Sequence, residues 1–115
     1  MYNRTTDAIQ ISVARGQRCT VVHCGGEVDL CTSAELNDAL RLAIEQQPEE
    51  ILLLCRDVKF MDSAGIHTLV NAAERARRQN IRLHVMPSPL MSRLVDLLGL
   101  RGHFDFVDAV HERIP

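Results

Sequence analysis

A wholly apolar segment followed by a long amphipathic one constrains this chain more than any other feature. Every residue from 51 to 55 is apolar, which indicates a central strand covered on both faces in a sheet with parallel neighbours. Residues 64–79 repeat their apolar side chains at helical spacing and predict a helix packed on that strand. The N–H groups at the start of such a helix are unpaired and lie at the carboxyl edge of the sheet. We therefore expect an α/β fold with its functional edge at residues 58–66.

Alternating apolar residues near the N-terminus predict an antiparallel hairpin. The alternation over residues 8–14 indicates a half-buried strand, residues 15–18 suit a tight turn, and residues 19–24 return as a second strand. Gly25 and Gly26 are expected to break this strand and to begin a loop.

Capping signals divide the rest of the chain into helices and strands. Thr32 and Glu35 fit a capping box, which predicts a helix that Pro48 stops. Ser88 and Pro89 are expected as the N-cap and first residue of another helix. The remaining expected features are a helix end at Asn80, strands over residues 81–85 and 104–110, and a helix end at Gly99.

These elements predict one domain over residues 1–115, a length that suits a single compact unit. The sheet is expected to be mixed and four- to five-stranded, with the N-terminal antiparallel hairpin at its beginning. Its strand–helix–strand units are long enough for right-handed crossovers. About three helices are expected, mainly on one face of the sheet.

Composition excludes several classes of partner. The net charge is −2, which gives no electrostatic reason to expect direct binding to nucleic acid or to an anionic membrane. No apolar run approaches the ~18–20 residues of a membrane span, and the N-terminus lacks a signal-peptide core. We therefore predict a cytoplasmic protein, either a monomer or a weak dimer.

The four cysteines predict neither disulfides nor a metal site. They form no Cys-x-x-Cys unit, and small buried thiols are the stronger interpretation. Metal binding by Cys19, His23 and Cys24 is a weaker alternative, because strand alternation puts His23 and Cys24 on opposite faces.

An enzyme is not expected. Ser63 follows the central strand, where a hydrolase nucleophile would lie, but that tight turn needs small residues on both sides of the serine. Gly65 satisfies this requirement and Met61 does not. A histidine would also have to reach Ser63, and the later ones, His103 and His111, lie in or near the C-terminal tail. Since no phosphate-binding loop or dinucleotide fingerprint is present, we predict no catalytic residue and no cofactor.

Two acidic residues are predicted at the same sheet edge as Ser63. Asp62 precedes the serine, and Asp29 follows the second strand of the hairpin. A helix-capping role suits Asp62 well and Asp29 less well, because Thr32 already fits the cap of its helix. Without a partner base, this cluster suits a surface that another protein recognises better than a reaction centre.

Two motifs resemble a known family. The motif Gly26-Glu27-Val28-Asp29 followed by Thr32, together with Phe-Met-Asp-Ser-Ala-Gly-Ile at residues 60–66, closely resembles the STAS domain and, within it, the bacterial anti-sigma-factor antagonists. The resemblance covers nearly the whole chain in element order. It implies that Ser63 is phosphorylated by an anti-sigma factor, which is a serine kinase. Ala64 stands where many relatives have a second serine.

The resemblance also implies a regulatory cycle and a binding surface. The unphosphorylated antagonist binds the anti-sigma factor and frees the sigma factor, and a serine phosphatase resets the cycle. The implied partner-binding residues are Asp29, Thr32, Met61, Asp62, Ser63, Ala64 and Gly65. An alternative is a non-switching STAS subunit that senses a ligand or serves as a scaffold, binding a nucleotide, a lipid or a larger assembly through the same edge.

The expected switch has a physical basis. Phosphorylation adds about −1.5 to −2 charges, which a helix N-terminus tolerates but a partner surface packed against it does not. For Gly65 we expect little space beside a docked partner, so that Gly65→Val weakens binding more than folding.

Overall fold

The computed structural model describes residues 2–108 of the chain. They form one six-stranded sheet in the order β1-β2-β3-β4-β5-β6. The strands are β1 (Tyr2–Thr5), β2 (Ile9–Arg15), β3 (Cys19–Val28), β4 (Glu50–Met61), β5 (Arg82–Met86) and β6 (Asp105–Phe106). The helices are α1 (Ser33–Glu45), α2 (Ser63–Arg78), α3 (Pro89–Leu97) and the short 3-10 helix η1 (Arg101–His103).

The sheet is mixed, as predicted, but has more strands than predicted. β1, β2 and β3 pair antiparallel, whereas β3, β4, β5 and β6 are parallel neighbours. The additional strand is β1, whose described side chains, Asn3, Arg4 and Thr5, are exposed. An edge strand of this kind has no apolar alternation, which explains why the estimate of four to five strands was too low.

β3 continues through the two glycines at which the sequence predicted a break. The register with β4 shifts between His23 and Gly25 and again between Gly26 and Glu27. Gly26 has a φ of 90°, a conformation that glycine adopts without steric cost. The strand therefore bends at the irregularity and resumes pairing, which brings Val28 into register with Met61 at the end of β4.

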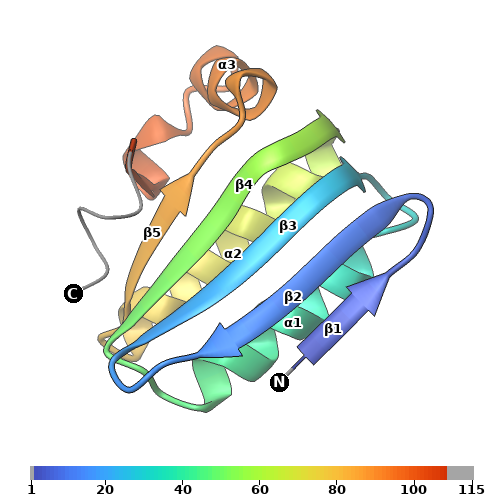
Figure 1. Cartoon of the computed structure of the whole chain (residues 1–115). Coiled ribbons are helices and arrows are strands. Elements are labelled where there is room, and N and C mark those ends of the chain that lie inside the picture. Colours follow the sequence, from blue (N-terminus) through green and yellow to red (C-terminus); the bar gives the residue numbers. More distant parts are fainter. Residues whose placement is uncertain (1, 109–115) are drawn as a thin grey trace.

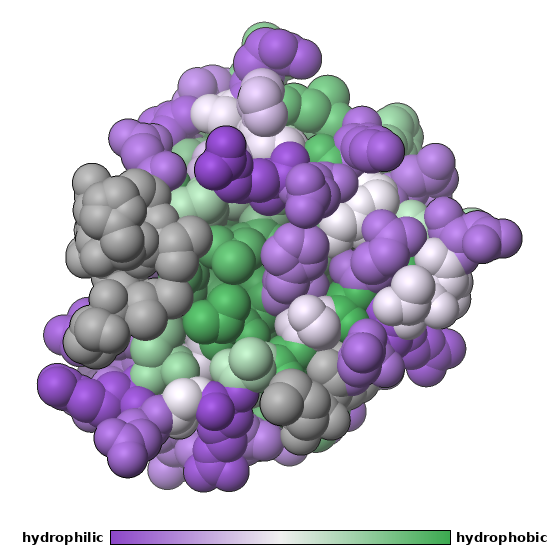
Figure 2. Space-filling view, viewed as in Figure 1, coloured by the Kyte–Doolittle hydropathy of each residue, from purple (hydrophilic) through white to green (hydrophobic). Residues whose placement is uncertain are grey.

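Helices α1 and α2 cover one face of the sheet (Figure 1). The main core lies between this face and the helices, and it includes the fully buried Ile11, Val22, Leu53, Leu40 and Leu69. The opposite face carries a smaller apolar cluster at its centre, ringed by polar side chains (Figure 2). Its residues are Cys19, Leu52, Met86 and Val107, with Val21 and Leu54 packed against them.

Several predicted element ends are confirmed. The Ser88 hydroxyl accepts a hydrogen bond from the N–H of Met91, and Pro89 is the first residue of α3. Asn80 follows α2 with a φ of 59°, as expected for a residue just after a helix end. The predicted last strand is shorter than expected, since β6 has two residues and positions 109 and 110 lie outside the described residues.

None of the helices within residues 2–108 is long and apolar enough to cross a membrane.

Candidate functional site: the carboxyl edge at β3 and β4

Two loops meet where the parallel strands β3 and β4 end (Figure 1). The N–H of Asp62 donates to the carbonyl of Val28 at 3.2 Å, which fixes the turn after β4 to the end of β3. The N–H of Leu30 donates to Oδ2 of Asp62 at 3.3 Å, which ties the loop after β3 to the same turn. The structure therefore brings the regions of Asp29 and Ser63 together at one edge, as the strand order of the sequence suggested.

Asp62 is the N-cap of α2. Its Oδ1 accepts hydrogen bonds from the N–H groups of Ala64, at 2.9 Å, and Gly65, at 3.2 Å. Since its Oδ2 accepts from Leu30, both carboxylate oxygens are used by the fold. This confirms the capping interpretation of Asp62 and leaves Ser63 as the first residue inside the helix.

The loop before α1 is organised differently from the prediction. Oδ1 of Asp29 accepts from the N–H groups of Cys31 and Thr32, at 2.9 and 3.1 Å. The Thr32 hydroxyl donates to the carbonyl of Glu27 at 2.7 Å and makes no capping bond to α1. The predicted capping box of Thr32 and Glu35 is therefore wrong, because the Thr32 hydroxyl is hydrogen-bonded within the loop and not to the start of α1.

Ser63 is exposed, and its hydroxyl makes no hydrogen bond to any residue between 2 and 108. It stands at the positive end of the α2 dipole, where added negative charge is tolerated. The side chain can therefore be modified without breaking a hydrogen bond in the described part of the chain.

The other predicted partner-binding residues differ in exposure. Thr32, Met61 and Gly65 are buried, whereas Asp29, Asp62 and Ala64 are half-buried. The buried residues shape the edge and offer little surface to a partner.

Gly65 is required by the fold itself. A Cβ at this position would lie 2.7 Å from the carbonyl oxygen of Val28 and 2.8 Å from Cγ of Met61. Both distances are too short for carbon, so a side chain would displace β3 or β4. The crowding at Gly65 is therefore internal, and we now expect Gly65→Val to weaken folding at least as much as binding.

Two exposed apolar side chains at this edge were missing from the predicted site. Leu30, in the loop after β3, is 80% exposed, and Phe60, two residues before Asp62, is 48% exposed. The available signal was an apolar residue directly after Asp29, in a stretch predicted to be loop. No sequence pattern indicated that the Phe60 side chain lies outside the core.

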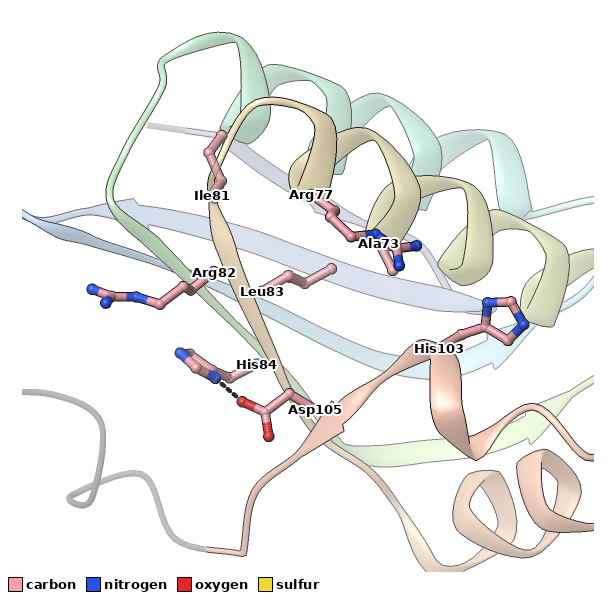
Figure 3. A pocket seen from close by; sticks show the side chains of 8 residues that line it. All are labelled: Ala73, Arg77, Ile81, Arg82, Leu83, His84, His103 and Asp105. Atoms are coloured by element: carbon pink, nitrogen blue, oxygen red, sulfur yellow. Dashed lines mark hydrogen bonds and ion pairs between the residues drawn. The ribbon is translucent and has the colours of Figure 1, made fainter.

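The hollow between α2, β5 and η1 lies elsewhere on the molecule (Figure 3). It measures about 280 Å³, and Leu83 points to the α2 side of β5 whereas Arg82 and His84 point to the other side. The buried His84 contacts carboxylates on both sides, with Glu50 at 2.9 Å from Nε2 and Asp105 beside Nδ1. None of the predicted partner-binding residues lines this hollow.

Between residues 2 and 108, no three His, Cys, Asp or Glu side chains are grouped closely enough to hold a metal ion. Side chains of β3 lie on both faces of the sheet, as the predicted strand alternation requires. Cys24 belongs to the main core, and Cys19 belongs to the cluster on the opposite face.

Comparison with known proteins links this edge to a family. The sequence pattern of the STAS domain matches residues 10–113. The chain is 27% identical over 109 residues to the anti-sigma-F factor antagonist RsfB of Mycobacterium tuberculosis, covering 94% of this chain and 88% of the relative. It is 25% identical over 100 residues to the anti-sigma-B factor antagonist of Bacillus subtilis, covering 87% and 89%.

A solved structure supports the same architecture. The crystal structure of an anti-sigma factor antagonist from Mycobacterium paratuberculosis superposes with a TM-score of 0.83 at 23% identity. The superposition covers 94% of this chain and 92% of the other. At 23% identity, this similarity shows a shared fold and nothing further.

Proposed function

The chain belongs to the STAS domain family, and we propose that it acts as an anti-sigma-factor antagonist controlled by phosphorylation of Ser63. In the proposed cycle, the unphosphorylated protein binds an anti-sigma factor with serine kinase activity and releases its sigma factor. The kinase then phosphorylates Ser63, and a serine phosphatase restores binding. The names of the two curated relatives support the general role.

The observation that carries the proposal is the state of Ser63. Its hydroxyl is exposed at the first residue of α2 and has no hydrogen-bond partner in the described chain, whereas the adjacent Asp62 is fully used as the helix cap. A kinase can therefore reach the hydroxyl while the cap stays intact. The same position suits a recognition surface better than a reaction centre, so we propose a regulatory protein without catalysis of its own.

Charge explains how the modification acts as a switch. A phosphoserine adds about −1.5 to −2 charges beside Asp62 and Asp29, and the helix N-terminus partly compensates them within the domain. A partner packed on this edge meets added bulk, repulsion and the cost of removing water from the phosphate. A loss of about 3 kcal/mol in binding free energy weakens the affinity by more than a hundredfold.

Phosphate labelling tests the proposal. The purified chain is incubated with the candidate anti-sigma factor and ATP, and Ser63→Ala is compared with Ser33→Ala. Ser33 is the matched control because it is the first residue of α1 at the same edge. We expect label in the wild type and in Ser33→Ala and none in Ser63→Ala. Undiminished labelling of Ser63→Ala would overturn the assignment.

The remaining properties are proposed on the same basis. We propose that residues 1–115 form a single STAS domain and that the protein acts in the cytoplasm as a monomer or weak dimer. No nucleotide, lipid or metal is needed for the proposed cycle beyond the ATP that the kinase consumes.

A further inference from the structure

We propose that Leu30 and Phe60 are the apolar anchors on which the anti-sigma factor docks around Ser63. This inference rests on the proposed function and names the surface that the partner contacts. The partner is therefore expected to present apolar side chains to this edge, and its affinity is expected to depend on both residues.

Exposure first distinguishes these two side chains. Five large hydrophobic residues are exposed by about a third or more within residues 3–108, namely Leu30, Leu42, Phe60, Leu97 and Leu98. A single exposed leucine is ordinary on a protein surface, whereas neighbouring ones at a functional edge are typical of an interaction site. Only Leu30 and Phe60 belong to the two segments that meet beside Ser63.

The backbone holds both anchors in place. The N–H of Leu30 is bonded to the Asp62 carboxylate, and the preceding Asp29 bonds the N–H groups that follow. Phe60 is part of β4, in register with Glu27 of β3. Their side chains are therefore displayed from ordered backbone, which lowers the ordering cost that binding would otherwise incur.

The position of Ser63 determines the occupant. A kinase that phosphorylates this hydroxyl must bring its active site into contact with it, and a standard interface covers about 800 Å² of each partner. Phe60 is three residues before Ser63, and Leu30 is bonded to the cap of the same helix, so both fall within such a footprint.

The polar groups of this edge favour apolar recognition. The carboxylate of Asp62 and Oδ1 of Asp29 accept hydrogen bonds from their own loops. Leu30, Phe60 and the Ser63 hydroxyl therefore remain available to a partner at this edge. Aromatic residues in particular contribute strongly when they are buried at the centre of an interface.

This arrangement also accounts for the sensitivity of the switch. A partner that covers Leu30 and Phe60 also removes water from the edge that carries Ser63. An unmodified hydroxyl tolerates this loss of water, whereas a phosphate is strongly disfavoured unless a partner cation compensates it. Apolar docking and inhibition by phosphate are thus linked.

Binding titrations test the anchors. The anti-sigma factor is titrated with Leu30→Ser, Phe60→Ser and the double variant, and Leu42→Ser serves as the control because Leu42 is 36% exposed on α1. We expect each single variant to weaken binding at least about tenfold and the double variant about a hundredfold or more, with Leu42→Ser unchanged. Melting temperatures should match the wild type, and the conservative Leu30→Met and Phe60→Leu should retain most of the affinity.

The outcomes separate this inference from the proposed function. If the wild type binds and is labelled on Ser63 while all the serine variants bind equally well, the anchors are wrong and the function stands. If the wild type neither binds an anti-sigma factor nor accepts phosphate, both proposals are overturned. A loss of binding in Leu42→Ser equal to that in Leu30→Ser would also contradict a localised surface.

Discussion

Two adjacent residues at the edge differ in how the fold uses their side chains. Asp62 uses both carboxylate oxygens to hold the start of α2 and the loop after β3, whereas the Ser63 hydroxyl stays free within the described chain. A modification of Ser63 therefore leaves the cap in place. This division makes it possible for one edge to change its charge and keep its shape.

The cap should be measurable in the stability of the protein. Asp62→Ala removes the acceptors of three backbone N–H groups, and loss of an N-cap typically costs about 0.5–2 kcal/mol. Asp62→Asn should retain most of the stability because asparagine is an equally good N-cap. Urea unfolding of both variants checks this. Equal stability of the alanine and asparagine variants would contradict the capping role.

Gly65 should tolerate not even a methyl group. Alanine favours a helix over glycine by about 1 kcal/mol, but here its Cβ would collide with the Val28 carbonyl, which belongs to the backbone. Overpacking of this kind costs typically 1–3 kcal/mol, so we expect Gly65→Ala to be destabilised overall. Gly102→Ala is the control, since a Cβ there meets no atom within 4 Å. The melting temperatures of the two variants should differ clearly. An unchanged melting temperature of Gly65→Ala would show that β3 shifts at little energetic cost to make room for the methyl group.

Residue-level prediction succeeded for Asp62 and failed for Thr32. Both threonine and glutamate occupy the spacing of a capping box, yet Asp29 three residues earlier binds the N–H of Thr32, and Glu27 takes its hydroxyl. Short polar side chains compete for the same backbone groups, and the sequence alone does not rank the competitors.

At the scale of elements, apolar patterns predicted the buried parts and missed the exposed ones. The segment at residues 51–55 is buried between neighbours on both sides, but β4 continues to Met61. Beyond Leu54 it pairs with β3 alone, so Arg56, Asp57 and Lys59 are exposed and resemble a loop in sequence. β1 was missed for the same reason, because its place depends on pairing with β2 and not on an apolar pattern of its own.

The contact between β3 and β4 includes a buried thiol pair that should make stability depend on pH. The hydrogen bond with Cys24, and then burial, raise the pKa of Cys55 well above its ordinary value. In the unfolded chain the pKa of a cysteine is about 8.5. Above that pH the unfolded state loses a proton that the folded state keeps, so the free energy of unfolding falls as pH rises.

Urea unfolding between pH 7.5 and pH 10 measures this dependence. One thiol contributes a slope of up to about 1.4 kcal/mol per pH unit. Cys55→Ala should reduce the alkaline loss, whereas Cys31→Ala, which removes an exposed thiol, should not. Burial also raises the pKa of Cys19, so the slope in Cys55→Ala should be reduced and not abolished. An identical pH dependence in Cys55→Ala and the wild type would rule out this contribution.

For the molecule as a whole, the order of strands and helices predicted the architecture and the meeting of the loops after β3 and β4 at one edge. Parallel pairing of β3 with β4 necessarily puts their carboxyl ends at one edge, and the helices that follow lie on the same face (Figure 1). The exposure of Leu30 and Phe60 could not be predicted. Sequence patterns assign apolar residues to the core, and only the three-dimensional structure shows which of them have no neighbours to cover them.

The last prediction concerns the whole molecule, because it separates a change of charge from a change of fold. Ser63→Asp and Ser63→Glu place one negative charge at the N-terminus of α2, which typically stabilises a helix by about 0.3–1 kcal/mol. Repulsion from Asp62 opposes this gain, and no cap is lost because Asp62 is the cap. Since 1 kcal/mol shifts the melting temperature of a domain this size by roughly 4–8 °C, we expect shifts of no more than a few degrees.

Binding to the anti-sigma factor should respond differently from folding. The acidic variants should lose most of their affinity, while Ser63→Ala, which adds neither charge nor bulk, should retain at least part of it. Thermal unfolding and a binding titration of all three variants, made on the same preparations, provide the comparison. If the acidic variants bind as well as Ser63→Ala, charge at this turn is not the switch. If they lose binding only because they unfold, the mechanism is equally excluded, since it requires an intact fold whose edge alone has become repulsive.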